Sequence, residues 1–214
     1  MSDQAAFQEV DDAVRQDDLK AWWKRYGTWV VGVAVIVVVA AAGLVGWRQY
    51  QTSQRAASSE LYSAALAKIG QDNKAARAEF DKLAETGVEP YRSLAALASA
   101  QFRDTPEEQV AALQAVAPKL PPELSDLALV LAGFRGIDTP KADEVTGKLD
   151  ALAQPERPFH GSAMELEALA AAHKGDLKKA RELWTSLVKD AAGPPGAAQR
   201  AQALLNYYGE AEAK

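Results

Sequence analysis

The chain has 214 residues and a formal net charge of −5. It contains no cysteine, which excludes disulfide bonds, thiolate metal ligands and a cysteine nucleophile. Its acidic balance offers no basic face of the size that nucleic-acid binding needs. Strong helix formers, with alanine first, dominate after residue 47, and runs of β-branched residues occur only before it. The composition therefore predicts an all-α protein.

An uncharged, apolar segment from Thr28 to Trp47 predicts one transmembrane helix over residues 28–47. A helix of this length spans about 30 Å, which is the thickness of the hydrocarbon core of a bilayer. Trp29 and Trp47 lie at its two ends, and Tyr26 and Tyr50 lie just outside them. Tryptophan and tyrosine concentrate at both membrane interfaces, so the flanks support a membrane-spanning segment that also contacts lipid.

The same segment has two other interpretations, a cleaved signal peptide and a buried core helix. Ala40, Ala41 and Ala42 could form a cleavage site, but the apolar run is longer than the roughly 7–15 residues of a signal peptide. A buried core helix would not explain aromatic residues at both ends. Ala42 and Gly46 would also allow a close helix–helix contact within the membrane.

Basic residues predict the orientation of the anchor. Four of them precede it and two closely follow it: Arg15, Lys20, Lys24 and Arg25, then Arg48 and Arg55. The side with more basic residues usually stays in the cytoplasm. We therefore expect residues 1–27 to be a short cytoplasmic segment in a single-pass, type II membrane protein. Residues 48–214 would form a helical domain outside, in the periplasm if the cell is a Gram-negative bacterium.

Glycine and proline recur at short intervals after Gly70 and separate segments of helix length. Between Trp47 and Gly70 there is no such residue, so the anchor helix is expected to continue into the domain. The later helices are predicted over a segment ending before Gly87, then over Tyr91–Phe102, Pro106–Ala117, Pro122–Phe134, Lys141–Ala153, two segments within 163–189, and 195–208.

Residues 163–189 resemble a tetratricopeptide (TPR) repeat, which is a pair of antiparallel helices. Ala168 is small enough for the first helix to pack close to the second, and Gly175–Asp176 makes the turn between them. Ala180 would lie at the tight crossing of the two helices. Trp184, four residues later, would fill the gap between them. This set of five residues is a more specific signal than the alanine and aromatic pair alone, which an alanine-rich chain produces by accident.

The same alanine and aromatic spacing occurs at Ala76 and Phe80, about three repeats of 34 residues earlier. Two weaker units fit between, although they carry Val110 with Gln114 and Val145 with Leu149 in place of that pair. The pattern predicts a TPR-like α-solenoid of about four helix pairs, closed by a C-terminal capping helix. The number of true units in residues 90–155 stays open, and an irregular helical bundle is the alternative.

The repeat register also predicts a candidate groove. The concave face of such an array is built by the first helix of each pair, and it can hold an extended peptide or a helix of a partner. The contacts predicted on this face are Leu61, Ala65 and Ile69 in the first unit and Glu165, Leu169 and His173 in the last.

No catalytic, cofactor-binding or metal-binding motif is found in the sequence. The two histidines, His160 and His173, cannot form a metal site alone. Glu165 and Glu167 are two residues apart on a helix and so point to different faces. Neither a P-loop nor a G-x-S-x-G nucleophile elbow occurs. We therefore expect a non-enzymatic protein with no cofactor.

The organisation of the chain resembles the ancillary subunit family of the bacterial SecYEG translocon (the YfgM-like family). The resemblance rests on Trp23–Gly27 before a valine-rich anchor, Gly46–Arg48 and Tyr50 after it, and Gly175–Trp184 near the C-terminus. It implies a protein of the bacterial inner membrane with a TPR-like periplasmic domain. It further implies association with SecYEG and with a membrane-anchored chaperone of the prolyl-isomerase (PPIase) type, and a role in assisting exported polypeptides.

The residues themselves leave a second function open, a structural scaffold for a cell-envelope or cell-division complex. The sequence gives no evidence on the partner, the clients or the oligomeric state.

Overall fold

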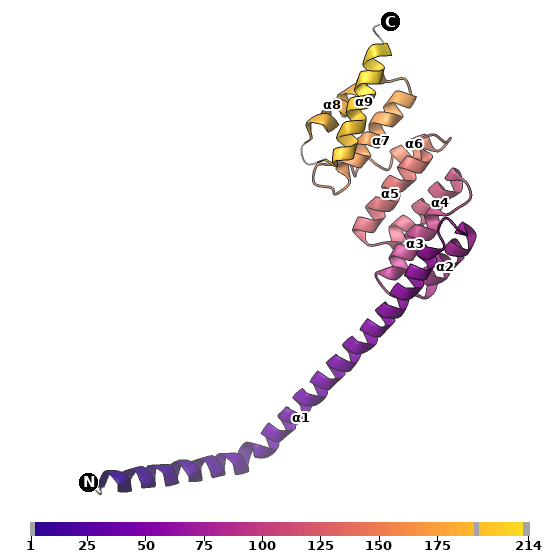
Figure 1. Cartoon of the computed structure of the whole chain (residues 1–214). Coiled ribbons are helices and arrows are strands. Elements are labelled where there is room, and N and C mark those ends of the chain that lie inside the picture. Colours follow the sequence, from indigo (N-terminus) through magenta and orange to yellow (C-terminus); the bar gives the residue numbers. More distant parts are fainter. Residues whose placement is uncertain (1–2, 191–192, 212–214) are drawn as a thin grey trace. The chain divides into compact units, whose positions relative to one another are not determined.

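The computed structural model describes residues 3–190 and 193–211, and the side chains of residues 20, 22–190, 193–194 and 196–208. Helices and turns account for this part of the chain, with no strand in it, as the composition predicts. The chain divides into two compact units, Met1–Gln54 and Arg55–Lys214. Among the described residues, the first holds most of one long helix, and the second holds the end of that helix, eight shorter α-helices and one 3-10 helix (Figure 1).

Helix α1 (Asp3–Ala67) contains the predicted anchor. Its part from Trp22 to Ala67 is long and apolar enough to cross a membrane, and none of its most apolar stretch is buried in the structure. Ile36 and Val38 are 68% and 67% exposed, for example. A core helix would bury such side chains, so their exposure favours the membrane anchor over a core helix. A lipid environment explains the exposed apolar surface, because lipid tails solvate it.

Most helices of the second unit have short connections, whereas residues 147–159 form a longer one (Figure 1). These helices are α2 (Asn73–Thr86), α3 (Tyr91–Gln101), α4 (Pro106–Val116), the 3-10 helix η1 (Ala117–Lys119), α5 (Pro122–Gly136), α6 (Ala142–Thr146), α7 (His160–His173), α8 (Leu177–Lys189) and α9 (Pro195–Ala211). Most begin and end within a few residues of the predicted bounds.

Side-chain caps explain where several of these helices begin. The side chains of Asp72, Thr105 and Asp176 accept hydrogen bonds from backbone N–H groups in the first turns of α2, α4 and α8. These bonds satisfy donors that have no partner within the helix. Gly175 has φ +80°, a value that glycine adopts without strain, and it ends α7 one residue before the Asp176 cap.

The last helix pair packs as the TPR pattern predicts. Ala168, Ala180 and Trp184 are fully buried in one cluster that α7, α8 and α9 share. The small alanines bring the helices together, and the indole fills the space between them. The Trp184 ring stacks on that of Tyr208 in α9, with ring centroids 5.4 Å apart. Helix α9 therefore closes the apolar face of the last pair, which is the role predicted for a capping helix.

The first TPR-like repeat, formed by the end of α1 and by α2, has the equivalent arrangement around Phe80. Ala76 and Phe80 of α2 are fully buried. The Phe80 ring lies 5.4 Å from that of Tyr62 in α1 and stacks on that of Phe102, at 6.1 Å. The spacing of Ala76 and Phe80 therefore identified a true packing site between helices.

The prediction of a full helix over Lys141–Ala153 is wrong. Helix α6 has only five residues, Ala142–Thr146, and turns follow it. Several backbone hydrogen bonds in this turn region join residues three apart, such as Leu149 N–H to Thr146 O and Leu152 N–H to Leu149 O, while Ala153 N–H bonds to Leu149 O, four residues away. Val145, Leu149 and Leu152 are nevertheless buried. The segment therefore buries the apolar side chains that suggested a helix, but in a tighter and irregular backbone.

Glycines of α5 explain how the middle of the domain packs so closely. A Cβ atom built at Gly133 would lie 2.6 Å from Leu166 Cδ1, and one at Gly136 would lie 3.1 Å from Val110 and Val145. Gly136, which the sequence suggested as a helix breaker, is instead the last residue of α5. Its role here is to allow contact, since any larger side chain would push the neighbouring helices apart.

A histidine–aspartate pair joins the start of α7 to the end of α8. His160 Nε2 lies 2.7 Å from Asp190 Oδ2, and both side chains are largely buried. His160 Nδ1 also lies 3.2 Å from the carbonyl oxygen of Arg157. The hydrogen bond with Asp190 raises the pKa of His160 above its ordinary value. Protonated His160 therefore stabilises the folded domain.

This raised pKa predicts a pH dependence of stability. The contribution of His160 is complete below the unfolded-state pKa of about 6.5 and is lost as pH rises through the higher folded-state pKa. The free energy of unfolding should therefore fall as the pH rises above about 6.5, the unfolded-state pKa, and through the higher folded-state pKa. Urea unfolding of the detergent-solubilised chain at several pH values would show this. His160→Gln should flatten the profile, whereas His173→Gln, at an exposed site, should not. An unchanged profile in His160→Gln would contradict the assignment.

Candidate functional site

A hollow of about 360 Å³ lies on the surface where α2, α3 and α4 meet. We call it the alanine hollow, because five alanines from the three helices line it. These are Ala84 of α2, Ala96 and Ala100 of α3, and Ala112 and Ala115 of α4. Val116 and four charged residues, together with Ser99, complete the lining. Short side chains, the five alanines and Ser99, therefore form just over half of the residues that line the hollow.

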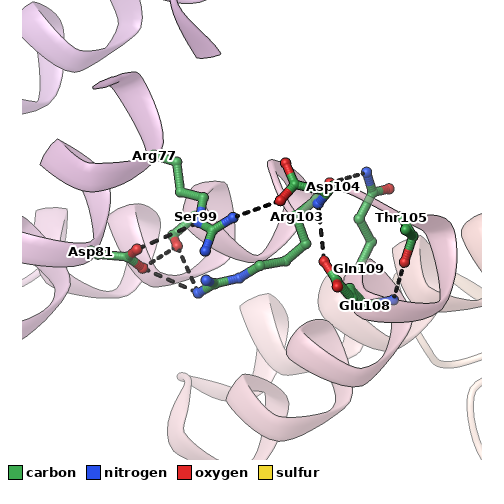
Figure 2. Close-up of polar contacts among 8 residues, drawn as sticks. All are labelled: Arg77, Asp81, Ser99, Arg103, Asp104, Thr105, Glu108 and Gln109. Atoms are coloured by element: carbon green, nitrogen blue, oxygen red, sulfur yellow. Dashed lines mark hydrogen bonds and ion pairs between the residues drawn. The ribbon is translucent and has the colours of Figure 1, made fainter. Parts of the chain in front are cut away.

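One edge of the alanine hollow is a polar network between α2 and α3 (Figure 2). Asp81 of α2 accepts hydrogen bonds from the Ser99 hydroxyl and from the Arg103 guanidinium, the latter at 3.2 Å. Arg103 also donates to the Ser99 hydroxyl oxygen, at 3.2 Å. Arg77 lies 3.7 Å from Asp81 and 3.7 Å from Asp104. The network holds Arg103 in place and joins the two helices at the edge of the hollow.

A second set of contacts fixes the turn from α3 to α4, on the right of the network in Figure 2. Gln109 donates from Nε2 to the carbonyl oxygen of Arg103, at 2.9 Å. The hydroxyl of Thr105 accepts from the Glu108 N–H, and the Glu108 carboxylate accepts from the Asp104 N–H. These hydrogen bonds hold both ends of the turn, so they fix the position of α3 relative to α4 beside the hollow.

In the first TPR-like repeat, the predicted groove residues differ in accessibility. Leu61 is 55% exposed and lines a smaller hollow of about 190 Å³ between α1 and α2, with Leu83 and Thr86 among its neighbours. Ile69 is 38% exposed and follows the end of α1. Ala65 is fully buried against Phe80 and its neighbours, so it belongs to the core and not to an accessible surface.

In the last unit, Glu165 is also buried, at 2% exposed. Its carboxylate accepts two hydrogen bonds from Arg200 of α9, at 2.5 and 2.6 Å. This ion pair raises the pKa of Arg200 and fastens α9 to α7. Leu169 is half-buried, and His173 is exposed, with Nε2 3.5 Å from Asp138. The structure therefore does not present the residues predicted for the last unit as one accessible face.

A second, more polar hollow of about 270 Å³ lies between α6 and the α7–α8 pair. Asp143, Asp150, Glu167 and Lys174 are among the charged residues that line it. Burial, and next the nearby Asp150 carboxylate, raise the pKa of the Glu167 carboxyl, while Lys174 pairs with Asp143 at 2.6 Å. Within the described residues, no group of three histidine or acidic side chains is placed to hold a metal ion.

Sequence reasoning missed the alanine hollow. Ala96 and Ala100 are four residues apart on α3, and Ala112 and Ala115 are three apart on α4, so each pair shares a helix face. Such pairs are frequent throughout this chain and carry no signal by themselves. The alternation of acidic and basic residues around them, with Asp81 and Arg103 in contact, becomes visible only when the helices are packed.

Comparison with known proteins gives one family match and one curated relative. The family model of the tetratricopeptide repeat-like domain matches residues 20–194, which include both the apolar helix and most of the helical domain. The relative, the "Ancillary SecYEG translocon subunit" of Haemophilus influenzae, is 24% identical over 109 residues, or 50% of this chain and 52% of that protein. The chain thus spans about half the length of the relative. No solved structure matches the chain.

Proposed function

Because the chain belongs to the tetratricopeptide repeat-like family, we propose that it is a non-enzymatic protein-interaction module anchored in the bacterial inner membrane. The observation that carries the proposal is the presence, in one chain, of an exposed apolar helix and a repeat-type helical domain with an open hollow. A single-pass anchor confines the domain to the membrane surface, which raises its effective concentration for partners in the same membrane.

We propose further that residues 1–27 are cytoplasmic and that the domain lies in the periplasm. The basic residues before the apolar helix support this orientation, since Lys24 and Arg25 precede it directly. The partner that the relative's name suggests is the SecYEG translocon. In this role the domain would assist exported polypeptides as they leave the channel, together with a membrane-anchored PPIase-like chaperone. A structural scaffold of an envelope or division complex is the competing function.

Co-purification from native membranes distinguishes these two functions. We expect a tagged full-length chain, solubilised in mild detergent, to recover the channel subunits several-fold above the background from cells with the untagged chain. A second tagged chain keeps the same helical domain but carries an unrelated single-span anchor of the same orientation. Equal recovery by this chain assigns the contact to the domain, and loss of recovery assigns it to the anchor. Recovery of envelope-assembly proteins or of the chain itself, without channel subunits, would support the scaffold and contradict the translocon role.

A further inference from the structure

The alanine hollow has a floor that favours close approach of a helix. Ala96 and Ala100 lie one turn apart on α3, and Ala112 and Ala115 lie about one turn apart on the neighbouring α4. Their side chains end at Cβ, so a third helix laid over them could approach with its backbone close to those of α3 and α4. Ala84 of α2 continues the same small-residue surface on the other side. Ala84, Ala96, Ala112 and Ala115 are partly or fully exposed, whereas Ala100 is 3% exposed and lies at the base of the hollow. The accessible floor is therefore built from small apolar side chains of three helices.

Hydrogen bonding decides between an extended segment and a helix as the occupant. An extended segment exposes backbone N–H and C=O groups, which must find partners when they leave water. The alanine floor offers none. At its edge Asp81, Ser99 and Arg103 bond to one another. The charged side chains that stay open, Glu85 and Lys119, lie outside the alanine floor. A helix satisfies its backbone internally and needs only an apolar stripe to cover the floor.

Two charged side chains of the hollow specify the partner further. Glu85 of α2 and Lys119 of η1 line the hollow and are exposed. Neither forms an ion pair with another residue in the described part of the chain. A bound helix with a cation facing Glu85 and an anion facing Lys119 would complete both pairs. Such complementary charges act mainly on orientation and specificity, so they would fix the direction in which the helix lies.

We propose that the alanine hollow binds an amphipathic α-helix of a partner protein, with an apolar stripe over the alanines and opposite charges toward Glu85 and Lys119. The inference rests on the proposed interaction function and narrows it, because it assigns this surface to a folded helix and not to an extended client. The binding site comprises α2, α3 and α4, with Arg103 held at its edge by Asp81 and Ser99.

Photo-crosslinking in native membranes tests the helical occupant. A photoreactive amino acid at Ala112 or Ala115 of the full-length chain should capture residues of one partner segment that are spaced three and four apart. The control position is Ala203, an exposed alanine of α9 outside the hollow. Four results would overturn the proposal: captured residues two apart, capture scattered over many chains, capture within a second copy of this chain, or a yield no higher than at Ala203.

The captured segment, synthesised as a peptide, gives the second test. A proline in its centre should weaken binding to the full-length chain more than about tenfold, whereas one in its first turn should not. The double change Glu85→Lys and Lys119→Glu should weaken binding about two- to fivefold, as exposed ion pairs contribute modestly. A peptide with reversed charges should restore it. Equal binding of the two proline peptides would contradict a helical occupant.

A matched double variant, Glu107→Lys with Lys189→Glu, reverses the same charges at exposed sites outside the hollow and should leave binding unchanged. The two proposals fail in different ways. Loss of channel subunits from the purified complex, with helical crosslinks retained, overturns only the translocon role. Recovery of those subunits without helical crosslinks overturns only the assignment of the hollow.

Discussion

Replacement of Trp184 by alanine is expected to reduce the free energy of unfolding by about 3–5 kcal/mol, the usual cost of removing a buried aromatic side chain. Trp184 is fully buried, contacts a cluster shared by three helices and stacks on Tyr208. Its indole N–H has no hydrogen-bond partner, so the whole loss comes from packing. The remaining cavity would be lined by Ala168 and Ala180, which are too small to close it.

The helices that Trp184→Ala destabilises are as informative as the loss in free energy of unfolding. Helical arrays are stabilised mainly by contacts between neighbouring units, so the effect should concentrate in α7, α8 and α9. Amide hydrogen exchange of the full-length chain in detergent should show faster exchange there, with α2 and α3 close to wild type. Tyr207→Ala removes a neighbouring aromatic ring that is 68% exposed, and should cost less than about 0.5 kcal/mol. Uniform acceleration across the domain would contradict the repeat architecture.

The ends of the repeat array were predictable because their packing uses a distinctive pair of residues. An alanine followed four residues later by a large aromatic ring places a small and a large side chain on the same face of a helix. Ala180 with Trp184, and Ala76 with Phe80, do this, and all four residues are fully buried. The aromatic ring carries most of the information, because such residues are rare in a chain otherwise dominated by alanine.

The middle of the domain was less predictable because its two units lack such a pair of alanine and aromatic residues at the corresponding positions. Val145 and Leu149 have helical spacing and are buried, yet the helix ends at Thr146. Apolar periodicity reports which side chains are buried, and a series of tight turns can bury them almost as well as a helix. A glycine at position 147 and turns with bonds between residues three apart replace the helix there. Tertiary packing, which the local pattern does not encode, selects between the two.

The accessibility of the groove residues depends on details of register that the sequence does not contain. Glu165 is charged, so an exposed position was the natural expectation, but Arg200 in α9 pairs with it and permits its burial. The partner is 35 residues away in the chain. Ala65 carries little information on exposure, because alanine in this chain occurs on exposed faces, as at Ala64, and on buried ones, as at Ala76. The alanine hollow was not predicted because alanines line it and their exposure cannot be deduced from the sequence.

Arginines at Val35 and Val38, near the middle of the apolar helix, are expected to prevent insertion of the chain into the membrane. Each arginine at the centre of a spanning helix costs about 2.5–3.5 kcal/mol. Both valines are now exposed, at 56% and 67%, so no contact within this chain would shelter the charge. The double variant should therefore move from the membrane fraction to the soluble or aggregated fraction, even though the helical domain itself is unaltered.

The absence of cysteine from the chain allows orientation to be measured in the same experiment. With Ser53→Cys, an exposed position of α1 after the apolar segment 28–47, an impermeant maleimide should label the anchored chain in intact cells whose outer membrane is permeabilised. Adding Val35→Arg and Val38→Arg should abolish this labelling until the cells are lysed. Control arginines at Ala111 and Ala203, exposed and remote from the span, should leave it unchanged. Labelling of the anchored chain only after lysis would place the domain in the cytoplasm and contradict a periplasmic role, because no binding surface on it could then meet an exported polypeptide.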